Sequence, residues 1–355
     1  MQFKVRLMLA MNPGKHLSRL AVAAIVVVGL LVGCGPAVTP LSTSVPPTAT
    51  PNVTPTPSPT PTATPMAQRW TPGQLEIHVL DVKHGDAQLI VSPTGETLLI
   101  DVAREEFAPK IAQYLREVLG EAAVDFVMLS HYHVDHIQGA VPLLRDHGIV
   151  VRRAVLDRGG DQQEYDSEHY RAYYDYVTDP AHGLKRIRVY MGDMIDMGPE
   201  ITVEVLAVGD IDTRTNLGIP VQENDNDNCI ALWLTLGKFD YWTAGDLSGV
   251  DSIRYADIES AVIPLLPRQV DVYRANHHAI DYNSNPDFLA ALNPTVTLAS
   301  TSHEVVGWET ILRLEKYGDV YITDQIPAHK AYGDIVLTSH DGETYTVEGK
   351  TYTSK

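Results

Sequence analysis

The chain has 355 residues, of which 44% are hydrophobic, and a formal net charge of −18. This charge excludes a protein that attracts polyanions through a general positive field, so any polyanionic ligand would need a local positive feature such as metal ions. The two cysteines are Cys34 and Cys229. Because Cys229 is the only cysteine beyond Cys34, the folded region can form neither an internal disulfide nor a cysteine-rich zinc site.

The N-terminus has the pattern of a secretory signal. Residues 1–20 carry basic and no acidic side chains, and the apolar stretch 21–32 that follows is too short for a permanent membrane span. It runs into "LVGC" (31–34), which resembles the lipobox of bacterial lipoproteins. That resemblance implies cleavage after a signal peptide of residues 1–33 and lipidation of Cys34.

The next segment, 34–68, reads as a tether. It is rich in proline and threonine and has no charged residue. Such a composition cannot bury enough apolar surface to offset the entropy of ordering, so we expect a disordered and partly polyproline II chain. At full extension it would reach roughly 100 Å. We therefore predict a folded domain over 69–355, held by a lipid anchor on the extracytoplasmic face of the cell membrane.

Strands and helices alternate along the folded region. Alternating or short buried apolar runs predict strands, and apolar residues at spacings of three and four predict helices. Pairs of strands interspersed with amphipathic helices indicate two sheets packed face to face with helices outside, an α/β four-layer αββα sandwich. The predicted strands are 74–81, 86–92, 96–102, 124–130, 152–157, 186–191, 201–208, 229–236, 240–246, 295–300, 320–324, 334–339 and 344–349, and the predicted helices are 108–119, 167–177, 285–293 and 307–318.

The most informative stretch is "DFVMLSHYHVDHIQGA", residues 125–140. His131 and His133 are two positions apart, so in an extended chain they point the same way and can grip one ion. Asp135 and His136 are offset and can reach a second ion. Histidine and carboxylate are ligands that Zn²⁺ and similar ions prefer, and two such ions can activate water and brace a reacting centre. The cluster predicts two divalent metal ions, Zn²⁺ or Mn²⁺; the alternative is a solvated polar loop.

These residues resemble a known family. His-x-His-x-Asp-His after a strand that ends in Leu-Ser resembles the signature of the metallo-β-lactamase fold. Three further segments, 80–103, 223–246 and 275–300, resemble the extracytoplasmic hydrolase domain of ComEC-type DNA-uptake proteins. The resemblance implies a metallo-hydrolase and a set of site residues.

The resemblance implies two metals that share one carboxylate. Asp246, in "TAGD", matches the carboxylate that bridges both ions, and Asp135 also belongs to the reacting centre. His277 matches the last histidine ligand, with His278 as the alternative, because alternating side chains would let only one of the pair face the metals. The implied ligands are His131, His133, Asp135, His136, Asp246 and His277.

Other residues are candidates for contacts around the metals. Asn226 and Asp227 fall where the family has paired asparagines that line the cleft, and His278 is a further candidate for substrate binding. His84 is either a donor next to a ligand or a surface histidine. Two acids match family positions that orient ligands or close a turn: Asp81 and Asp86.

The sequence also departs from the family pattern. Lactamase-like enzymes often place a third first-metal histidine between the cluster and the Gly-Asp, whereas here the histidines in that interval, His147, His169 and His182, have no convincing context. Asp225, Asp227 or water would then complete the first site. "HHAI" lacks the family's Gly-Ser after the histidines. The tyrosines of helix 167–177 could form a base-stacking wall, but their spacing favours packing.

The function that this sequence favours is an extracytoplasmic metal-dependent phosphodiesterase or nuclease. The expected substrate is a phosphodiester, with DNA as a candidate, and no obligate protein partner is evident. Two alternatives remain open: a hydrolase of another bond, such as a lactone, thioester or β-lactam, because the same centre activates water for any of them, and a lipoprotein that binds metal without turnover.

Overall fold

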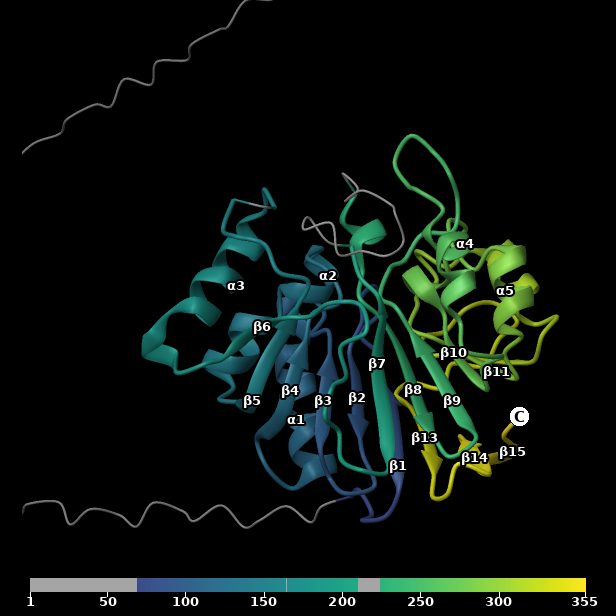
Figure 1. Cartoon of the computed structure of the whole chain (residues 1–355), viewed down its shortest axis with the longest axis horizontal. Helices are drawn as coiled ribbons and strands as arrows, with labels where there is room; N and C mark the ends of the chain where they lie inside the picture. The colour runs from purple at the N-terminus through teal and green to yellow at the C-terminus, as the bar shows by residue number, and fades with distance from the viewer. Residues whose placement is uncertain (1–68, 164, 210–223) are drawn as a thin grey trace, which may run out of the picture. The chain divides into compact units, whose positions relative to one another are not determined.

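The computed structural model describes residues 69–163, 165–209 and 224–355 (Figure 1). The predicted signal peptide (1–33), the lipidation site Cys34 and the tether (34–68) lie outside the described residues. Within the described ranges, no helix combines the length and the apolar character that a membrane crossing requires.

The first sheet has nine strands in the order β15-β14-β13-β1-β2-β3-β4-β5-β6. Neighbours from β15 to β3 pair antiparallel, whereas β3, β4, β5 and β6 run parallel. The sheet is therefore mixed. Its strands are β1 (Leu75–Val79), β2 (Gln88–Val91), β3 (Thr97–Ile100), β4 (Ala123–Met128), β5 (Val150–Asp157), β6 (Arg186–Arg188), β13 (Ile335–Ser339), β14 (Thr344–Val347) and β15 (Lys350–Thr353).

The second sheet has six strands in the order β12-β11-β10-β9-β8-β7. It repeats the plan of the first, because β7, β8 and β9 are antiparallel and β9, β10, β11 and β12 are parallel. Three-residue β10 and the terminal β15 were not among the predicted strands. The strands of this sheet are β7 (Ile201–Ala207), β8 (Ala231–Leu236), β9 (Phe239–Thr243), β10 (Val272–Arg274), β11 (Val296–Ala299) and β12 (Asp319–Ile322).

Three hydrophobic cores separate four layers. One core fills the space between the sheets, and the other two lie under the helices on the outer faces. Figure 1 shows α1 and α3 beside the first sheet and α4 and α5 beside the second. The predicted αββα sandwich is confirmed. The helices are α1 (Ala108–Leu119), α2 (Val134–Ile137), α3 (Glu168–Thr178), α4 (Ile258–Val262), α5 (Pro286–Leu292) and α6 (Trp308–Leu314).

Local sequence explains the two longest helices. In α1, Ile111, Leu115 and Val118 recur at helical spacing and are buried against the first sheet. The helix ends at Gly120, whose φ of 74° is the left-handed conformation that glycine adopts easily. In α3, Ser167 caps the first turn by accepting a hydrogen bond from the backbone N–H of Tyr170. Both helices match the ranges predicted from the sequence.

The tyrosines of α3 are mostly core residues. Tyr170 and Tyr173 are fully buried, and Tyr174 and Tyr176 pack partly buried beside the same core. The predicted packing role is therefore confirmed for this helix.

The parallel strands determine which edge of the sheets carries the candidate site. Parallel neighbours bring their carboxyl ends to one edge of a sheet, and loops at that edge commonly carry ligand sites. Here the segment after β4 in one sheet meets the loops after β9 and β10 in the other, where His136 contacts Asp246 and His278. Polar and titratable side chains gather in these loops.

Candidate metal centre

Two histidine nitrogens converge on one carboxylate oxygen of Asp246. His136 Nε2 lies 3.1 Å from Asp246 Oδ1, His278 Nε2 lies 3.4 Å from the same oxygen, and the two histidine nitrogens are 3.3 Å apart. Asp135 Oδ2 lies 3.5 Å from His278 Nε2. We call Asp135, His136, His278 and Asp246 the second cluster. These side chains are almost fully buried.

Hydrogen bonds behind the second cluster fix the histidine tautomers. His136 Nδ1 lies 2.7 Å from Asp101 Oδ2, and His278 Nδ1 lies 3.1 Å from the carbonyl oxygen of Ser300. Both oxygens are acceptors, so each Nδ1 carries the proton. The two Nε2 atoms then present lone pairs to each other and to Asp246, as metal-ligating histidines do.

Three lone pairs facing one point require a positive charge between them. Asp246 Oδ1 accepts no hydrogen bond from any described residue. Burial opposes protonation of His278, yet Asp246 and Asp135 raise its pKa to about 9, so the carboxylates favour positive charge at Nε2, either a proton or a metal ion that replaces it. Imidazole nitrogens and carboxylate oxygens are the donor set of Zn²⁺ and of related divalent ions. The residues therefore fit a divalent metal ion.

A second group of donors lies at the other oxygen of Asp246. His131 Nε2 is 3.8 Å and His277 Nε2 is 3.5 Å from Asp246 Oδ2, and His133 Nδ1 lies 3.1 Å from His131 Nε2. We call His131, His133, His277 and Asp246 the first cluster. Ser130 Oγ donates to Asp101 and lies 3.0 Å from His131 Nδ1, so this ring also turns Nε2 inward. Asp246 is common to both clusters.

The expectation that only one histidine of the adjacent pair faces the centre is wrong. It assumed an extended chain, but His277 and His278 lie in a tight turn (Asn276–Ala279) with φ of 48° and 55°. In this left-handed conformation successive side chains do not alternate. His277 therefore reaches one oxygen of Asp246 and His278 the other.

Asp225 and Asp227, the acids near the first cluster, already have hydrogen-bond or ion-pair partners within the protein. Asp225 Oδ2 accepts a hydrogen bond from the backbone N–H of Tyr132, and its other oxygen pairs with Arg158. Asp227 accepts a bond of 2.7 Å from the backbone N–H of Ala256, and burial raises its pKa. These contacts give both acids a role in shaping loops. In place of the third histidine that lactamase-like enzymes often carry in the interval after the cluster, the structure brings His277 to the same oxygen of Asp246 as His131.

The three histidines of that interval lie on or next to helical elements. His169 is on α3, His182 is in the turn that follows it (Pro180–His182), and His147 ends the short helix Pro142–Asp146. His182 stacks on Tyr176 with ring centroids 3.9 Å apart. The sequence-based decision to leave them out of the site agrees with these positions.

Two of the remaining predicted residues border the clusters. His84 Nε2 lies 3.1 Å from Asp135 Oδ2, and its side chain is 41% exposed, so His84 is both a donor next to a ligand and a surface histidine. Asn226 Nδ2 lies 3.1 Å from His277 Nε2. Asp81 instead binds Lys83, whose backbone N–H and ammonium both donate to its carboxylate, which agrees with the predicted role of closing a turn.

The sequence reasoning missed Asp101 and Arg274. Asp101 binds both His136 and Ser130, and Arg274 links Asp86, at 2.7 Å, to the loop that carries Asp246. The signal for Asp101 was present, because it directly follows β3 at the same sheet edge as the histidine cluster. Arg274 gave no such signal, since an arginine at the end of a three-residue strand looks like a surface residue.

Comparisons with known proteins agree with this fold. Residues 80–227 match the family model described as the metallo-beta-lactamase superfamily. Together with two mixed sheets between helical layers, the match shows that the chain has the metallo-beta-lactamase fold, whose proteins are mostly metal-dependent hydrolases. No curated protein matches the chain.

Solved structures resemble the chain at low identity. The metallo-beta-lactamase fold protein YhfI from Bacillus subtilis is 17% identical over 74% of this chain and 98% of its own, with a TM-score of 0.46. A diphosphatase from the PhnP family is 17% identical over 75% and 98%, with a TM-score of 0.41. Zn²⁺-bound PqqB from Methylobacterium extorquens is 13% identical over 68% and 85%, with a TM-score of 0.42.

Proposed function

We propose that this protein is a metal-dependent phosphodiesterase with a dinuclear centre. The observation that carries the proposal is the convergence of histidine nitrogens on both oxygens of Asp246, from loops of both sheets. Two divalent ions, Zn²⁺ or Mn²⁺, would activate water near neutral pH and offset the charge of a reacting phosphodiester. In this proposal the ligands are those of the first and second clusters, with His277 as the third histidine of the first site.

The chain's own residues would position these ions and the substrate. Asp246 sets the distance between the two sites because each of its oxygens faces one cluster. Asp135 lies between His278 and the half-exposed His84, so its carboxylate can accept a hydrogen bond from a water on the open side of the centre. Asn226 lies at His277 and offers an amide to a substrate oxygen.

The resemblance to ComEC-type hydrolase domains supports a phosphodiester over a lactone, a thioester or a β-lactam. The charge of −18 limits which phosphodiester is suitable. Duplex DNA lays a dense row of charges on its partner and normally requires basic groups, whereas a single strand or a small ester can bring one phosphate to the ions. Single-stranded DNA is therefore the better candidate of the two.

A substrate panel tests the proposal. Metal-free protein is reloaded with Mn²⁺ or Zn²⁺ and given bis(p-nitrophenyl) phosphate, single-stranded DNA, duplex DNA and a homoserine lactone. We expect metal-dependent cleavage of the phosphodiesters, faster on the single strand than on the duplex, and none by Asp246→Asn. Lactone turnover without phosphodiester cleavage would contradict the proposal, and bound metal without any turnover would favour the binding lipoprotein.

We also propose that the enzyme works outside the cell, anchored by lipid on Cys34. The proposal rests on the lipobox-like "LVGC" and the uncharged tether after it. A multiply acylated cysteine holds a protein on a membrane stably, whereas one chain does so only marginally. Membrane fractionation of the wild type against Cys34→Ala measures this, and an equal soluble distribution of the two would contradict it.

A further inference from the structure

Two tyrosine rings border the first cluster. The ring centroid of Tyr165 lies 6.1 Å from that of His133, and the ring centroid of Tyr255 lies 5.8 Å from that of His277. Both histidines belong to the first cluster: His133 contacts His131, and His277 contacts Asp246. The two tyrosines therefore stand beside the metal centre itself.

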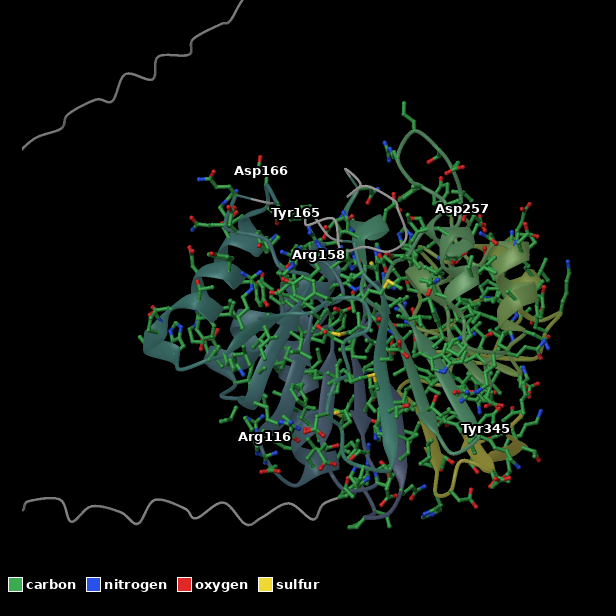
Figure 2. All side chains as sticks on the ribbon, in the orientation of Figure 1. Arg116, Arg158, Tyr165, Asp166, Asp257 and Tyr345 are labelled. Carbon is green, nitrogen blue, oxygen red and sulfur yellow. The ribbon has the colours of Figure 1, made fainter. Side chains whose placement is uncertain are left out.

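These tyrosines differ from the buried ones nearby. Tyr132, Tyr170 and Tyr173 are at most 1% exposed and pack in the core under α3. Tyr165 and Tyr255 are half-buried and lie in loops, before α3 and before α4. Figure 2 labels Tyr165 and also Asp257, which is two residues after Tyr255 in the sequence. The two labelled residues lie on opposite sides of the end of the domain where the loops gather.

The aromatic surface continues outward on one side. The ring of Tyr282 lies 5.2 Å from that of Tyr255 at an interplanar angle of 31°, and Tyr282 is 48% exposed. His277, Tyr255 and Tyr282 thus form an aromatic shelf that leads from the first cluster toward solvent. Tyrosine is enriched at binding surfaces because its ring has an apolar face for packing and a hydroxyl group for contact with water.

We propose that Tyr165 and the Tyr255–Tyr282 shelf determine substrate specificity by stacking on a nucleobase next to the cleaved phosphodiester. The inference rests on the proposed phosphodiesterase function. Base–aromatic stacking contributes roughly 1–3 kcal/mol per base and tolerates any base, because every base has a flat π-face. It also suits an acidic chain, since stacking supplies affinity without the basic side chains that duplex binding requires.

Binding of small ligands tests the stacking directly. Isothermal calorimetry of the Mn²⁺-loaded full-length protein compares adenosine 5′-monophosphate with ribose 5-phosphate, which has the same phosphate and sugar but no base. We expect the nucleotide to bind about tenfold more tightly, which is within the range for stacking of one base. Tyr165→Leu and Tyr255→Leu should each reduce this preference severalfold and leave the affinity for ribose 5-phosphate unchanged.

Two controls separate stacking from other effects. Tyr332→Leu alters a tyrosine that packs on Tyr321, 4.8 Å away in the edge strand β12, and should change neither affinity. Tyr255→Phe keeps the ring and should retain the preference. Equal affinities for the two ligands in the wild type would overturn the inference, and so would a Phe variant that loses as much as the Leu variant.

A kinetic comparison keeps this inference separate from the proposed function. Thymidine 5′-(p-nitrophenyl phosphate) and 1,2-dideoxyribose 5-(p-nitrophenyl phosphate) share the leaving group and the sugar and differ in the base. We expect kcat/KM to favour the thymidine ester about tenfold in the wild type and severalfold less in the Leu variants. Hydrolysis of neither ester would contradict the proposed function, whereas hydrolysis of both at equal efficiency would contradict only the stacking.

Discussion

Arg274 is a charged residue that the fold buries completely behind the centre. Its Nη1 donates a hydrogen bond of 2.8 Å to the carbonyl oxygen of Gly245, and its Nη2 lies 2.7 Å from Asp86 Oδ2. Neither Arg274 nor Asp86 has any exposed surface. Because Gly245 precedes Asp246, the buried pair holds the backbone from which the shared carboxylate projects.

We predict that Arg274→Met destabilises the protein more than an ordinary core substitution does. Removing one partner of a buried ion pair leaves the other charge uncompensated, which typically costs about 3–5 kcal/mol. Urea unfolding of the metal-free protein measures the free energy of unfolding. The double variant Arg274→Met/Asp86→Asn should recover part of the loss, and a cost under about 1 kcal/mol for the single variant would contradict the assignment.

At the scale of the element, the turn Asn276–Ala279 is the most unusual segment of the site. His277, His278 and Ala279 have φ of 48°, 55° and 55°, a conformation that costs residues other than glycine roughly 1–2 kcal/mol each. Asn283 holds the turn by donating its side-chain N–H to the carbonyl oxygens of Asn276 and His277. This unfavourable backbone conformation lets the adjacent side chains of His277 and His278 both contact Asp246.

Ala279 offers a direct test of this strain. It lies where the ComEC-type hydrolase domains have glycine. Ala279 is as fully buried as Ala275, whose φ of −57° is ordinary for alanine. Each Ala→Gly variant loses one buried methyl group and gains unfolded-state entropy, so those effects cancel in the comparison. We predict that Ala279→Gly is less destabilising than Ala275→Gly by about 1–2 kcal/mol. Equal losses in urea unfolding would show that the turn stores no strain.

At the scale of the whole molecule, the two clusters join the two sheets. His131, His133, Asp135 and His136 follow β4 of the nine-stranded sheet, whereas Asp246 and the His277–His278 pair follow β9 and β10 of the six-stranded sheet. Ions held between them would link both layers at one edge of the sandwich. Ligands that bind only the folded state stabilise it in proportion to their affinity.

We therefore predict that thorough chelation lowers the thermal midpoint. A metal present at 1,000 times its dissociation constant stabilises by about 4 kcal/mol, which corresponds to a shift on the order of 10 °C. Differential scanning fluorimetry with and without chelator measures the shift. Asp246→Asn should fold but show little difference between the two conditions, and an unchanged midpoint in the wild type would contradict a metal that bridges the sheets.

The sequence by itself determined what depends on near neighbours along the chain. The span of α1 follows from the spacing of Ile111, Leu115 and Val118 and from Gly120 at its end. The cluster from His131 to His136 was equally visible, because its donors lie within six positions after a buried strand. Alternating strands and intervening helices likewise predicted the layered αββα sandwich, which the topology confirms.

Only the tertiary structure decided how distant donors combine. The division of His277 and His278 between the two oxygens of Asp246 depends on left-handed backbone angles, which contacts with Asn283 hold and which no local pattern encodes. The role of Asp101 depends in the same way on β3 pairing beside β4, which brings its carboxylate to His136. The physical reason is range: periodicity reports the forces between near neighbours, whereas the centre combines side chains that lie 35 residues apart, as Asp101 and His136 do, and up to 142 residues apart, as His136 and His278 do.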